Sequence, residues 1–504
     1  MLSVGIRFGN GFDRANVLKL MNSLPMSWDY DFLVLGCSVG GIACALEASS
    51  AGKKTAIVKW KNYSTAEEEG KEARKIMSRA ASMQNTLEQA VNYGWRVRTS
   101  IQSLTINWKK MSELVMDHLM KENWELLNKI VKSGIEILEG KPCFIDSHTI
   151  KISPKGFKDF EVTANLICAA PSGEYYIPHD LPGAKECGIT CDDFIRLKNP
   201  PETTLIVGST PEGLECASIL AGFQLSVFVV SRSDLLNGFD FEMSQMIVKE
   251  LKEKGVNFFE KTILTSLTYG QNKKIMAEFS SVETSEDGLP LNKFSKLFDT
   301  VVFAIGTVIS LDYLELGNAG IEIDILQNKI LTNQYDQTSV SNIYAVGDGV
   351  ASNPQNNEIG EMVGKLLGRR LFKESTEILD YFMIPNAIYT PTEYAYAGLS
   401  ENAALYRFGK ECVEVYQTFF LPSESISLKD KTECFVKAVV YKTKNLIIGL
   451  HIFGPQASEI IQGFAAAIKL GMTINQINAL VGISSTNANE VVKISNRSKE
   501  VIKS

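Results

Sequence analysis

Histidine, paired cysteine and long apolar runs are scarce in this sequence, and each shortage narrows what the protein can be. Only four histidines occur in 504 residues, at His118, His148, His179 and His451. None of the nine scattered cysteines forms a Cys-x-x-Cys pair. Their odd number and their spacing indicate free, mostly buried thiols in a reducing compartment.

Basic runs and membrane-spanning runs are also missing. The formal net charge is −7, which argues against nucleic acid or an anionic membrane as the main partner. No segment approaches the roughly 20 apolar residues that cross a bilayer. We therefore predict a soluble, cytoplasmic protein. Arg7, Arg14 and Lys19 face one acid, Asp13, in the first 27 residues, so a mitochondrial transit peptide is the alternative.

Two stretches share the order strand, glycine turn, helix, strand. The first begins at Asp29 and the second at Thr203. Such βαβ units are typical of dinucleotide-binding domains with parallel sheets. Residues 299–307 and 342–350 are predicted to be strands that return to the first of these domains. After about residue 372, hairpin-like strands and two helices predict an α+β domain with one antiparallel sheet.

Between the two units, a helical stripe predicts one amphipathic helix facing the core and ended by Gly94. The stripe consists of Ala73, Ile76, Met77, Ala80, Met83, Leu87 and Val91.

The first glycine turn keeps the first and last glycines of the dinucleotide fingerprint, Gly36 and Gly41, with Ser38 between them. The middle glycine normally lets the backbone approach a pyrophosphate, so a side chain there narrows the gap. The acid expected at the end of the second strand is replaced by Lys59. The turn is therefore expected to keep its packing role and to lose ligand contacts.

The second turn has the same pattern, with Gly208, Thr210 and Gly213. Its second strand is followed by Arg232 instead of an acid. A guanidinium there suits the 2′-phosphate of NADPH, but a solvated arginine at a strand end explains it equally well.

Several longer segments carry a family resemblance that extends from about Tyr30 almost to the C-terminus. They are YDFLVLG, NYGW, CDDF, GLECASILAG, RSDLLNGFD, YAVGD, PTEYAYAGLSE and FGPQASEIIQGFAAAIKLG. The chain resembles the large, dimeric thioredoxin reductases, which are glutathione-reductase-like flavoprotein disulfide reductases. Such enzymes pass a hydride from NADPH to FAD, then electrons to a nearby disulfide and to a C-terminal redox pair of the other subunit.

The resemblance implies an α/β fold with two Rossmann-like domains and a C-terminal α+β dimerisation domain. We expect an FAD-type domain over residues 1–165 and 295–371, an NADPH-type domain over residues 166–294, and an interface domain over residues 372–504. It further implies a homodimer, or a heterodimer with an active relative.

The same resemblance indicates that the redox chemistry is lost. Ala66 and Lys71 stand where the family carries its two redox cysteines. Ser484 and Asn489 stand in place of the catalytic His and Glu, and no histidine follows His451. No cysteine follows Cys434, so the C-terminal redox pair is missing too. We therefore predict no catalytic residues for disulfide reduction.

Cofactor binding is less certain from the residues. Asp348 and Gly347 match the acid and glycine that the family places at the flavin ribityl chain. Ser38, Lys59 and the segment CAAPS at residues 168–172 weigh against FAD, because each lost hydrogen bond costs about 1 kcal/mol. We predict that FAD binding is doubtful.

Lys75 and Glu215 match a lysine and glutamate that the family pairs beside the flavin. They indicate either a retained nicotinamide site or, as we prefer, a structural ion pair between domains. Asn237 replaces a second phosphate-binding arginine, so NADPH binding is predicted to be weak.

Two functions fit these observations. One is a pseudoenzyme with a structural, dimerisation or regulatory role. The other is a residual FAD- and NADPH-dependent oxidoreductase of the diaphorase or NADPH oxidase type. The stretch TAEEEGK at residues 65–71 reads as a helix start, with Thr65 and Glu68 forming a capping box where the redox loop would lie.

Overall fold

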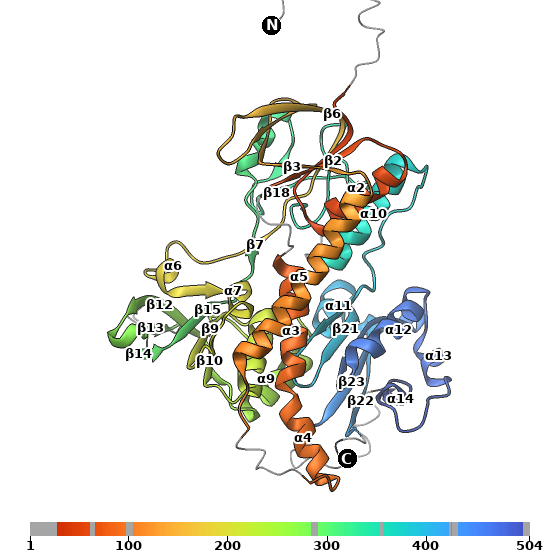
Figure 1. Ribbon diagram of the computed structural model, residues 1–504. Coiled ribbons are helices and arrows are strands. Elements are labelled where there is room, and N and C mark those ends of the chain that lie inside the picture. Colours follow the sequence, from red (N-terminus) through yellow and green to blue (C-terminus); the bar gives the residue numbers. More distant parts are fainter. Residues whose placement is uncertain are drawn as a thin grey trace, which may run out of the picture. The chain divides into compact units, whose positions relative to one another are not determined.

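The computed structural model describes residues 28–60, 66–96, 104–283, 291–351, 356–422, 425 and 432–496. Contacts divide the chain into two compact units. The first comprises Met1–Tyr63, Asn128–Ser172 and Ser310–Ile378, and the second comprises Ser64–Leu127, Gly173–Ile309 and Leu379–Ser504. Figure 1 shows the elements coloured along the chain. Within the described residues, every helix is too short or too polar to cross a membrane.

The first unit contains a seven-stranded sheet with the order β3-β2-β1-β6-β5-β4, and β19 pairs with β6. The strands are β1 (Tyr30–Leu35), β2 (Thr55–Lys59), β3 (Glu136–Glu139), β4 (Lys141–Phe144), β5 (Thr149–Ser153), β6 (Phe160–Ala169) and β19 (Ile343–Ala345). β19 runs parallel to β6. The predicted return of residues 342–350 to this domain is therefore confirmed.

Two helices pack closely against each other in this unit: α2 (Val39–Ser50) and α10 (Asn357–Phe372) (Figure 1). Glycines allow their backbones to meet, because a Cβ added at Gly364 would overlap the Gly40 carbonyl. The hairpin β17 (Ile323–Asp324) and β18 (Lys329–Ile330) completes the unit.

The second unit contains a parallel sheet with the order β11-β10-β9-β15-β8. Its strands are β8 (Gly188–Thr190), β9 (Thr204–Val207), β10 (Val227–Val230), β11 (Asn257–Phe259) and β15 (Thr300–Phe303). Its helices are α6 (Ala184–Cys187), α7 (Cys191–Ile195), α8 (Pro211–Gly222) and α9 (Phe241–Glu253). An antiparallel sheet adds β12 (Thr262–Tyr269), β13 (Ile275–Ser281) and β14 (Lys293–Phe298), and β7 (Glu174–Tyr175) pairs with β16 (Thr307–Val308).

The strand within residues 299–307 corrects one prediction. β15 pairs with β9 and β8 in the second sheet and not with the first domain. Periodicity identified a buried strand correctly, but a buried apolar strand carries no mark of which parallel sheet it joins.

The predicted amphipathic helix is divided into α3 (Ala66–Ala81) and α4 (Met83–Asn92). Ala73 and Met77 on α3 are buried, as expected. Met83, Leu87 and Val91 on α4 are exposed. The prediction that the whole stripe faces the core is therefore wrong for its second half. The capping box at Thr65 lies outside the described residues.

The first half of α5 (Trp108–Lys132) packs against the hydrophobic core that also contains Ala73 and Met77 of α3. The Trp108 indole N–H donates to the Leu197 carbonyl at 2.7 Å, which fixes the start of this helix beside α7.

An antiparallel sheet forms the C-terminal part, with the order β20-β21-β24-β23-β22-β25. The strands are β20 (Pro385–Ile388), β21 (Tyr394–Gly398), β22 (Val413–Phe420), β23 (Cys434–Tyr441), β24 (Leu446–Phe453) and β25 (Ser495–Asn496). The helices are α11 (Glu401–Phe408), α12 (Ala457–Lys469), α13 (Ile474–Asn478) and α14 (Asn487–Val491). The predicted α+β domain with one antiparallel sheet is confirmed, whereas its exact boundary remains a prediction.

Candidate functional site

Both predicted glycine turns have the same construction. Gly36 and Gly208 have φ angles of 112° and 110°, which favour glycine. A Cβ at Gly36 would overlap the Ala170 carbonyl, and one at Gly208 would overlap the Ala304 carbonyl. The last glycine of each turn, Gly41 or Gly213, also abuts the side chain of that alanine. Each turn is therefore held between its own helix and a neighbouring strand end.

The side chains that replace the middle glycines cap the helices. Ser38 accepts a hydrogen bond from the Gly41 N–H at 3.3 Å, and Thr210 accepts one from the Gly213 N–H at 3.3 Å. The first N–H groups of a helix are also the groups that bind a phosphate. In each turn, one of these donors is already satisfied by the protein.

Gly347 and Asp348 lie beside the first turn. Gly347 has a φ of 83°, and a Cβ added there would lie 3.3 Å from Ser38 Oγ. Asp348 is buried. The structure thus brings the residues predicted for FAD together at the carboxyl ends of β1 and β19, where ligands bind in such sheets.

Two features change the predicted FAD site beside the first glycine turn: one neutralises a charge, and the other reduces the free space. Lys59, at the end of β2, forms an ion pair with Glu139 at 3.3 Å. Pro171 packs against Gly349, because a Cβ at Gly349 would lie 2.5 Å from Pro171 Cγ. Lys59 is therefore engaged with the edge strand β3, and proline fills space in the CAAPS segment.

Arg232 follows β10 and is exposed. Within the described residues it forms no ion pair. Nearby, Ser209 of the second turn contacts Ser231, with 3.1 Å between the hydroxyl oxygens. The loop that carries Arg232 is therefore in contact with the loop that carries Gly208. The Arg232 guanidinium remains available to an anion.

The predicted pair of Lys75 with Glu215 is wrong by one residue. Arg74 Nε lies 2.7 Å from Glu215 Oε2, and both side chains are buried. Glu215 Oε1 also accepts from the Tyr389 N–H at 3.0 Å. Lys75 is exposed and lies over the Tyr389 ring, 4.9 Å from its centroid.

The electrostatics of this pair keep Arg74 charged. Burial acts to lower the pKa of Arg74, but the Glu215 carboxylate outweighs it and holds the pKa well above its ordinary value. The pair ties α3 to α8 and to the segment after β20, which agrees with a structural role.

Ala66 and Lys71, which the resemblance places at the positions of the redox cysteines, lie on α3, which begins at Ala66. Lys71 is half-buried on that helix. Neither side chain provides a thiol.

Sequence reasoning missed two thiol contacts elsewhere. Cys44 lies beside Cys168, and Cys191 lies beside Cys216. Burial raises the pKa of Cys44, and the contact with Cys216 together with burial raises the pKa of Cys191. Such thiols are poor nucleophiles.

Ser484 and Asn489, which the resemblance places at the positions of the catalytic His and Glu, lie around α14. Ser484 is exposed in the preceding turn. Asn489 packs over Gly482, because a Cβ added at Gly482 would overlap the side-chain amide oxygen of Asn489. The neighbouring Glu490 is paired with Lys493 at 2.6 Å. Within residues 482–496, which the structure describes, no histidine is present to protonate a thiolate.

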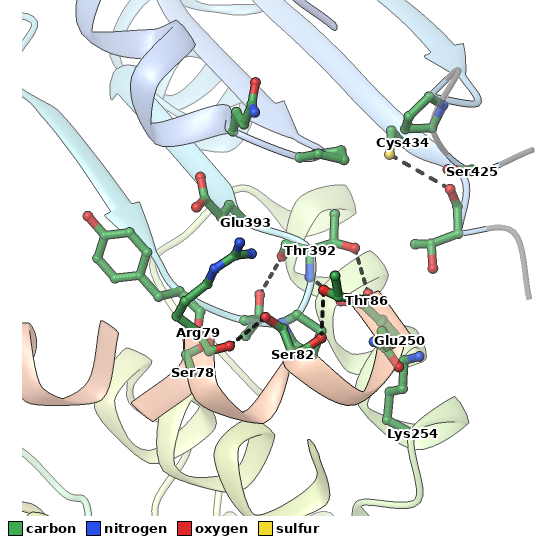
Figure 2. Close-up of a pocket in the computed structure, with 18 of the residues that line it drawn as sticks. Ser78, Arg79, Ser82, Thr86, Glu250, Lys254, Thr392, Glu393, Ser425 and Cys434 are labelled. Carbon is green, nitrogen blue, oxygen red and sulfur yellow. Dashed lines mark hydrogen bonds between the residues drawn. The ribbon is translucent and has the colours of Figure 1, made fainter. Parts of the chain in front are cut away.

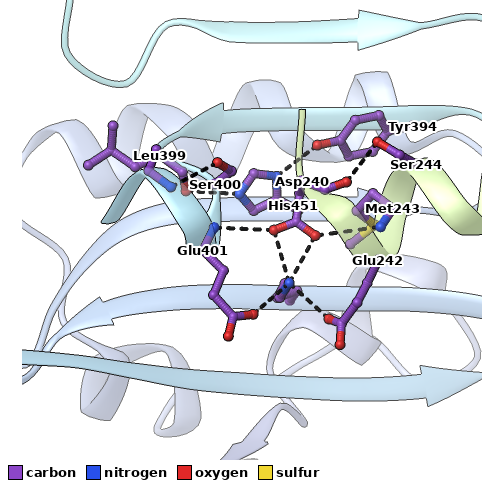
Figure 3. Close-up of polar contacts among 11 residues, drawn as sticks. Asp240, Glu242, Met243, Ser244, Tyr394, Leu399, Ser400, Glu401 and His451 are labelled. Atoms are coloured by element: carbon purple, nitrogen blue, oxygen red, sulfur yellow. Dashed lines mark hydrogen bonds and ion pairs between the residues drawn. The ribbon is translucent and has the colours of Figure 1, made fainter. Parts of the chain in front are cut away.

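A buried charge cluster was not predicted (Figure 3). The Lys437 side chain is 1% exposed. Its Nζ lies 2.9 Å from Asp240, 2.8 Å from Glu242 and 2.8 Å from Glu401. Asp240 also accepts from the Glu401 N–H at 3.2 Å. These contacts join the loop before α9 to the antiparallel sheet.

His451 lies beside this cluster and is also internal. Its Nδ1 lies 2.9 Å from the Tyr394 hydroxyl, and its Nε2 lies 3.0 Å from the Leu399 carbonyl oxygen. Burial lowers the pKa of His451. This histidine is therefore neutral and enclosed, and both of its ring nitrogens are engaged within the protein.

Comparison with known proteins agrees with this geometry. The family model of the pyridine nucleotide-disulphide oxidoreductases matches residues 30–363, and the model of the dimerisation domain of that family matches residues 384–494. The chain is 34% identical over 490 residues to "Thioredoxin reductase 2, mitochondrial" of Drosophila melanogaster, covering 95% of this chain and 93% of that protein. It is 33% identical over 485 residues to "Thioredoxin reductase SEP1" of Emiliania huxleyi, covering 92% and 94%.

Proposed function

The chain belongs to the pyridine nucleotide-disulphide oxidoreductase family, and on that premise we propose that it has kept the thioredoxin-reductase-like fold without the disulfide-reducing reaction. The observation that carries the proposal is that two parts of the catalytic machinery are lost together: the redox cysteine pair and the acid for the leaving thiolate. Ala66 and Lys71 cannot form or break a disulfide, and Ser484 cannot act as the acid for a leaving thiolate. The thiol pairs elsewhere are buried within their own units.

The proposed role is structural or regulatory and uses the C-terminal domain. That domain matches the dimerisation domain of the family, which supports a homodimer. A heterodimer with an active relative is the alternative partner. In either assembly the chain would contribute its interface while its own redox position stays inert. We place the protein in the cytoplasm.

The cofactor residues fit FAD only in part. Gly36, Gly41, Gly347 and Asp348 have the positions that a flavin nucleotide needs. Ser38 opposes them, because its hydroxyl lies against Gly347 and already accepts from the helix. We propose that FAD, if retained, is held weakly. When bound, FAD supplies hydride and electron transfer, and this chain offers no disulfide to receive the electrons.

NADPH is proposed to bind weakly for a similar reason. Gly208, Gly213 and Arg232 favour it, whereas Thr210 caps α8 and Asn237 supplies no charge. These residues can bind and orient a nucleotide. None of them can accept a proton or a hydride from it.

A second function is favoured by two observations. Asp348 and Gly347 remain beside the first glycine turn, and the Arg74 and Glu215 pair is intact. A residual FAD- and NADPH-dependent diaphorase or NADPH oxidase would need these groups and no cysteine pair.

The experiment that separates the two functions is an absorbance spectrum of the gently purified protein, followed by addition of NADPH. A colourless protein without thioredoxin turnover supports the first function. A yellow protein that NADPH bleaches, still without thioredoxin turnover, supports the second.

A further inference from the structure

One helix of the second unit has its apolar side turned outward. All ten residues of α4 are described, and none of them is buried. Met83, Leu87 and Val91 follow one another at intervals of four residues and are 42%, 38% and 38% exposed. Residues at this spacing lie on one face of a helix. These three side chains therefore form a continuous apolar stripe, named here the α4 face.

The opposite side of α4 is polar, although it is the side that faces the protein. Asn85 and Gln89 line a cavity of about 680 Å³, together with Ser82 and Thr86. Figure 2 shows Ser82 and Thr86 on this side of the helix. Because a helix turns by about 100° per residue, Gln89 lies about 200° from Leu87. A surface helix normally has the reverse arrangement, with its apolar face toward the core.

The packing of this chain therefore leaves the α4 face without a function. Apolar side chains that gather on one exposed element mark an interaction surface, whereas single exposed ones need no explanation. Tyr93 and Trp95, which directly follow α4, are exposed as well. Aromatic residues of this kind contribute a large share of the binding energy of many interfaces.

We propose that α4 packs against α4 of a second copy of this chain, across a two-fold axis at Leu87. The inference rests on the homodimer of the proposed function and adds a contact outside residues 384–494, which match the dimerisation domain. A two-fold axis perpendicular to a helix makes the two copies antiparallel. Leu87 then meets Leu87 of the partner subunit, and Met83 meets the partner's Val91.

The charge of α4 favours a second copy over another kind of partner. The helix carries one charged residue, Glu88, and this residue lies about 100° from Leu87 around the helix axis. The α4 face itself is therefore uncharged. It does not repel its own copy, and it offers no charge to an acidic or a basic partner.

The position of α4 favours the same partner. The cavity beside α4 is also lined by Cys434, Pro455 and Gln456, which lie within the match to the dimerisation domain. α4 therefore lies next to the domain that the family uses to dimerise. Stable interfaces bury about 1,200–2,000 Å² in total, and a stripe of three side chains is smaller than that. The α4 contact thus adds to the contact made by the dimerisation domain and does not replace it.

Sedimentation velocity of the full-length protein over a concentration series tests the inference. We expect a dimer whose dissociation constant Leu87→Glu raises at least about tenfold, because two carboxylates then face each other at the axis. Gln89→Glu adds the same charge on the cavity side of the same helix and should leave the constant unchanged. Leu326→Glu, at an exposed apolar residue of the first unit, should leave it unchanged too.

Cross-linking locates the axis. Leu87→Cys should form a covalent dimer on treatment with diamide, which accepts the two electrons and two protons that two thiols release as the disulfide forms. Gln89→Cys and the wild type should remain uncross-linked. A mixture of Met83→Cys and Val91→Cys should cross-link more than either variant alone, because antiparallel helices bring these two positions together.

Two results would overturn the inference and leave the homodimer in place: a dimer that Leu87→Glu does not weaken, or a Leu87→Cys variant that does not cross-link. A wild type that is monomeric would overturn both. The absorbance spectrum and the thioredoxin assay have independent readouts, so failure of the proposed loss of activity is seen separately. Circular dichroism checks the folding of each variant, and Leu87→Cys keeps the test valid if Leu87→Glu misfolds.

Discussion

Arg74 and Glu215 form a buried ion pair, with Arg74 Nε 2.7 Å from Glu215 Oε2, on two helices that lie 141 residues apart in sequence. The carboxylate also holds the Tyr389 N–H. One pair thus connects α3, α8 and the segment that follows β20. The helix that starts at Ala66 is therefore fixed by a contact that needs no redox chemistry.

We predict that Arg74→Met lowers the free energy of unfolding by about 3–5 kcal/mol, because Glu215 is left buried and unpaired. The matched control is Lys75→Met, one residue along the same helix. It should cost less than about 1 kcal/mol, since Lys75 is exposed and lies over an aromatic ring. Urea unfolding followed by circular dichroism measures both. Equal losses in the two variants would show that the pair is not a structural tie.

Protonation of His451 is predicted to set an acid limit on stability. In the unfolded chain its pKa is near 6.5, whereas burial lowers the pKa in the folded protein. Below pH of about 6.5 the unfolded state binds a proton that the folded state does not, so stability is lost as the pH falls toward the folded pKa. The slope is at most about 1.4 kcal/mol per pH unit.

His451→Gln should flatten this slope between pH 6.5 and the folded pKa, measured as urea midpoints over a pH series. His179→Gln, at an exposed position, should keep the slope of the wild type. An unchanged slope in His451→Gln would contradict the assignment.

Ser38 gives a prediction about the flavin site. Ser38→Gly should raise the flavin content of the purified protein, because it removes the side chain beside Gly347 and frees the Gly41 N–H. It should cost only a few tenths of a kcal/mol in stability, whereas Ser38→Ala should cost about 1 kcal/mol without the same gain in flavin. Flavin absorbance per chain is the readout. A lower flavin content in Ser38→Gly would show that the hydroxyl assists the cofactor.

Restoring the cysteine pair alone should not restore turnover. The double variant Ala66→Cys with Lys71→Cys supplies two thiols, but Ser484 and Asn489 still provide no acid for the leaving thiolate. NADPH-dependent reduction of thioredoxin, with FAD added, should stay at background. Adding Ser484→His and Asn489→Glu to that variant tests whether turnover is then limited by the missing acid at these two positions. Turnover by the cysteine variant alone would show that another group acts as the acid.

Sequence patterns predicted the features that depend on local order. The glycine turns at Gly36 and Gly208 were identifiable because their residues are adjacent and their geometry excludes side chains. The antiparallel C-terminal sheet was identifiable from its hairpin periodicity. The cluster at Lys437 was not, since its partner Asp240 lies 197 residues away and a lysine within a strand gives no sign of burial.

Register on a helix explains the error at Lys75. Adjacent helical residues point about 100° apart, so a one-residue difference exchanges a buried pair for an exposed side chain. Arg74 was the inward residue. The break at Ser82 was missed because the apolar period continues through it, although α4 turns its stripe away from the core.

The most direct test of the central claim is the rate of NADPH-dependent thioredoxin reduction by the purified wild-type protein with FAD added. A thioredoxin reductase with an intact cysteine pair is assayed at the same concentration as the reference. We predict a rate no higher than that of a sample without protein, whether or not flavin is bound. Sustained thioredoxin turnover that depends on this chain would contradict the account.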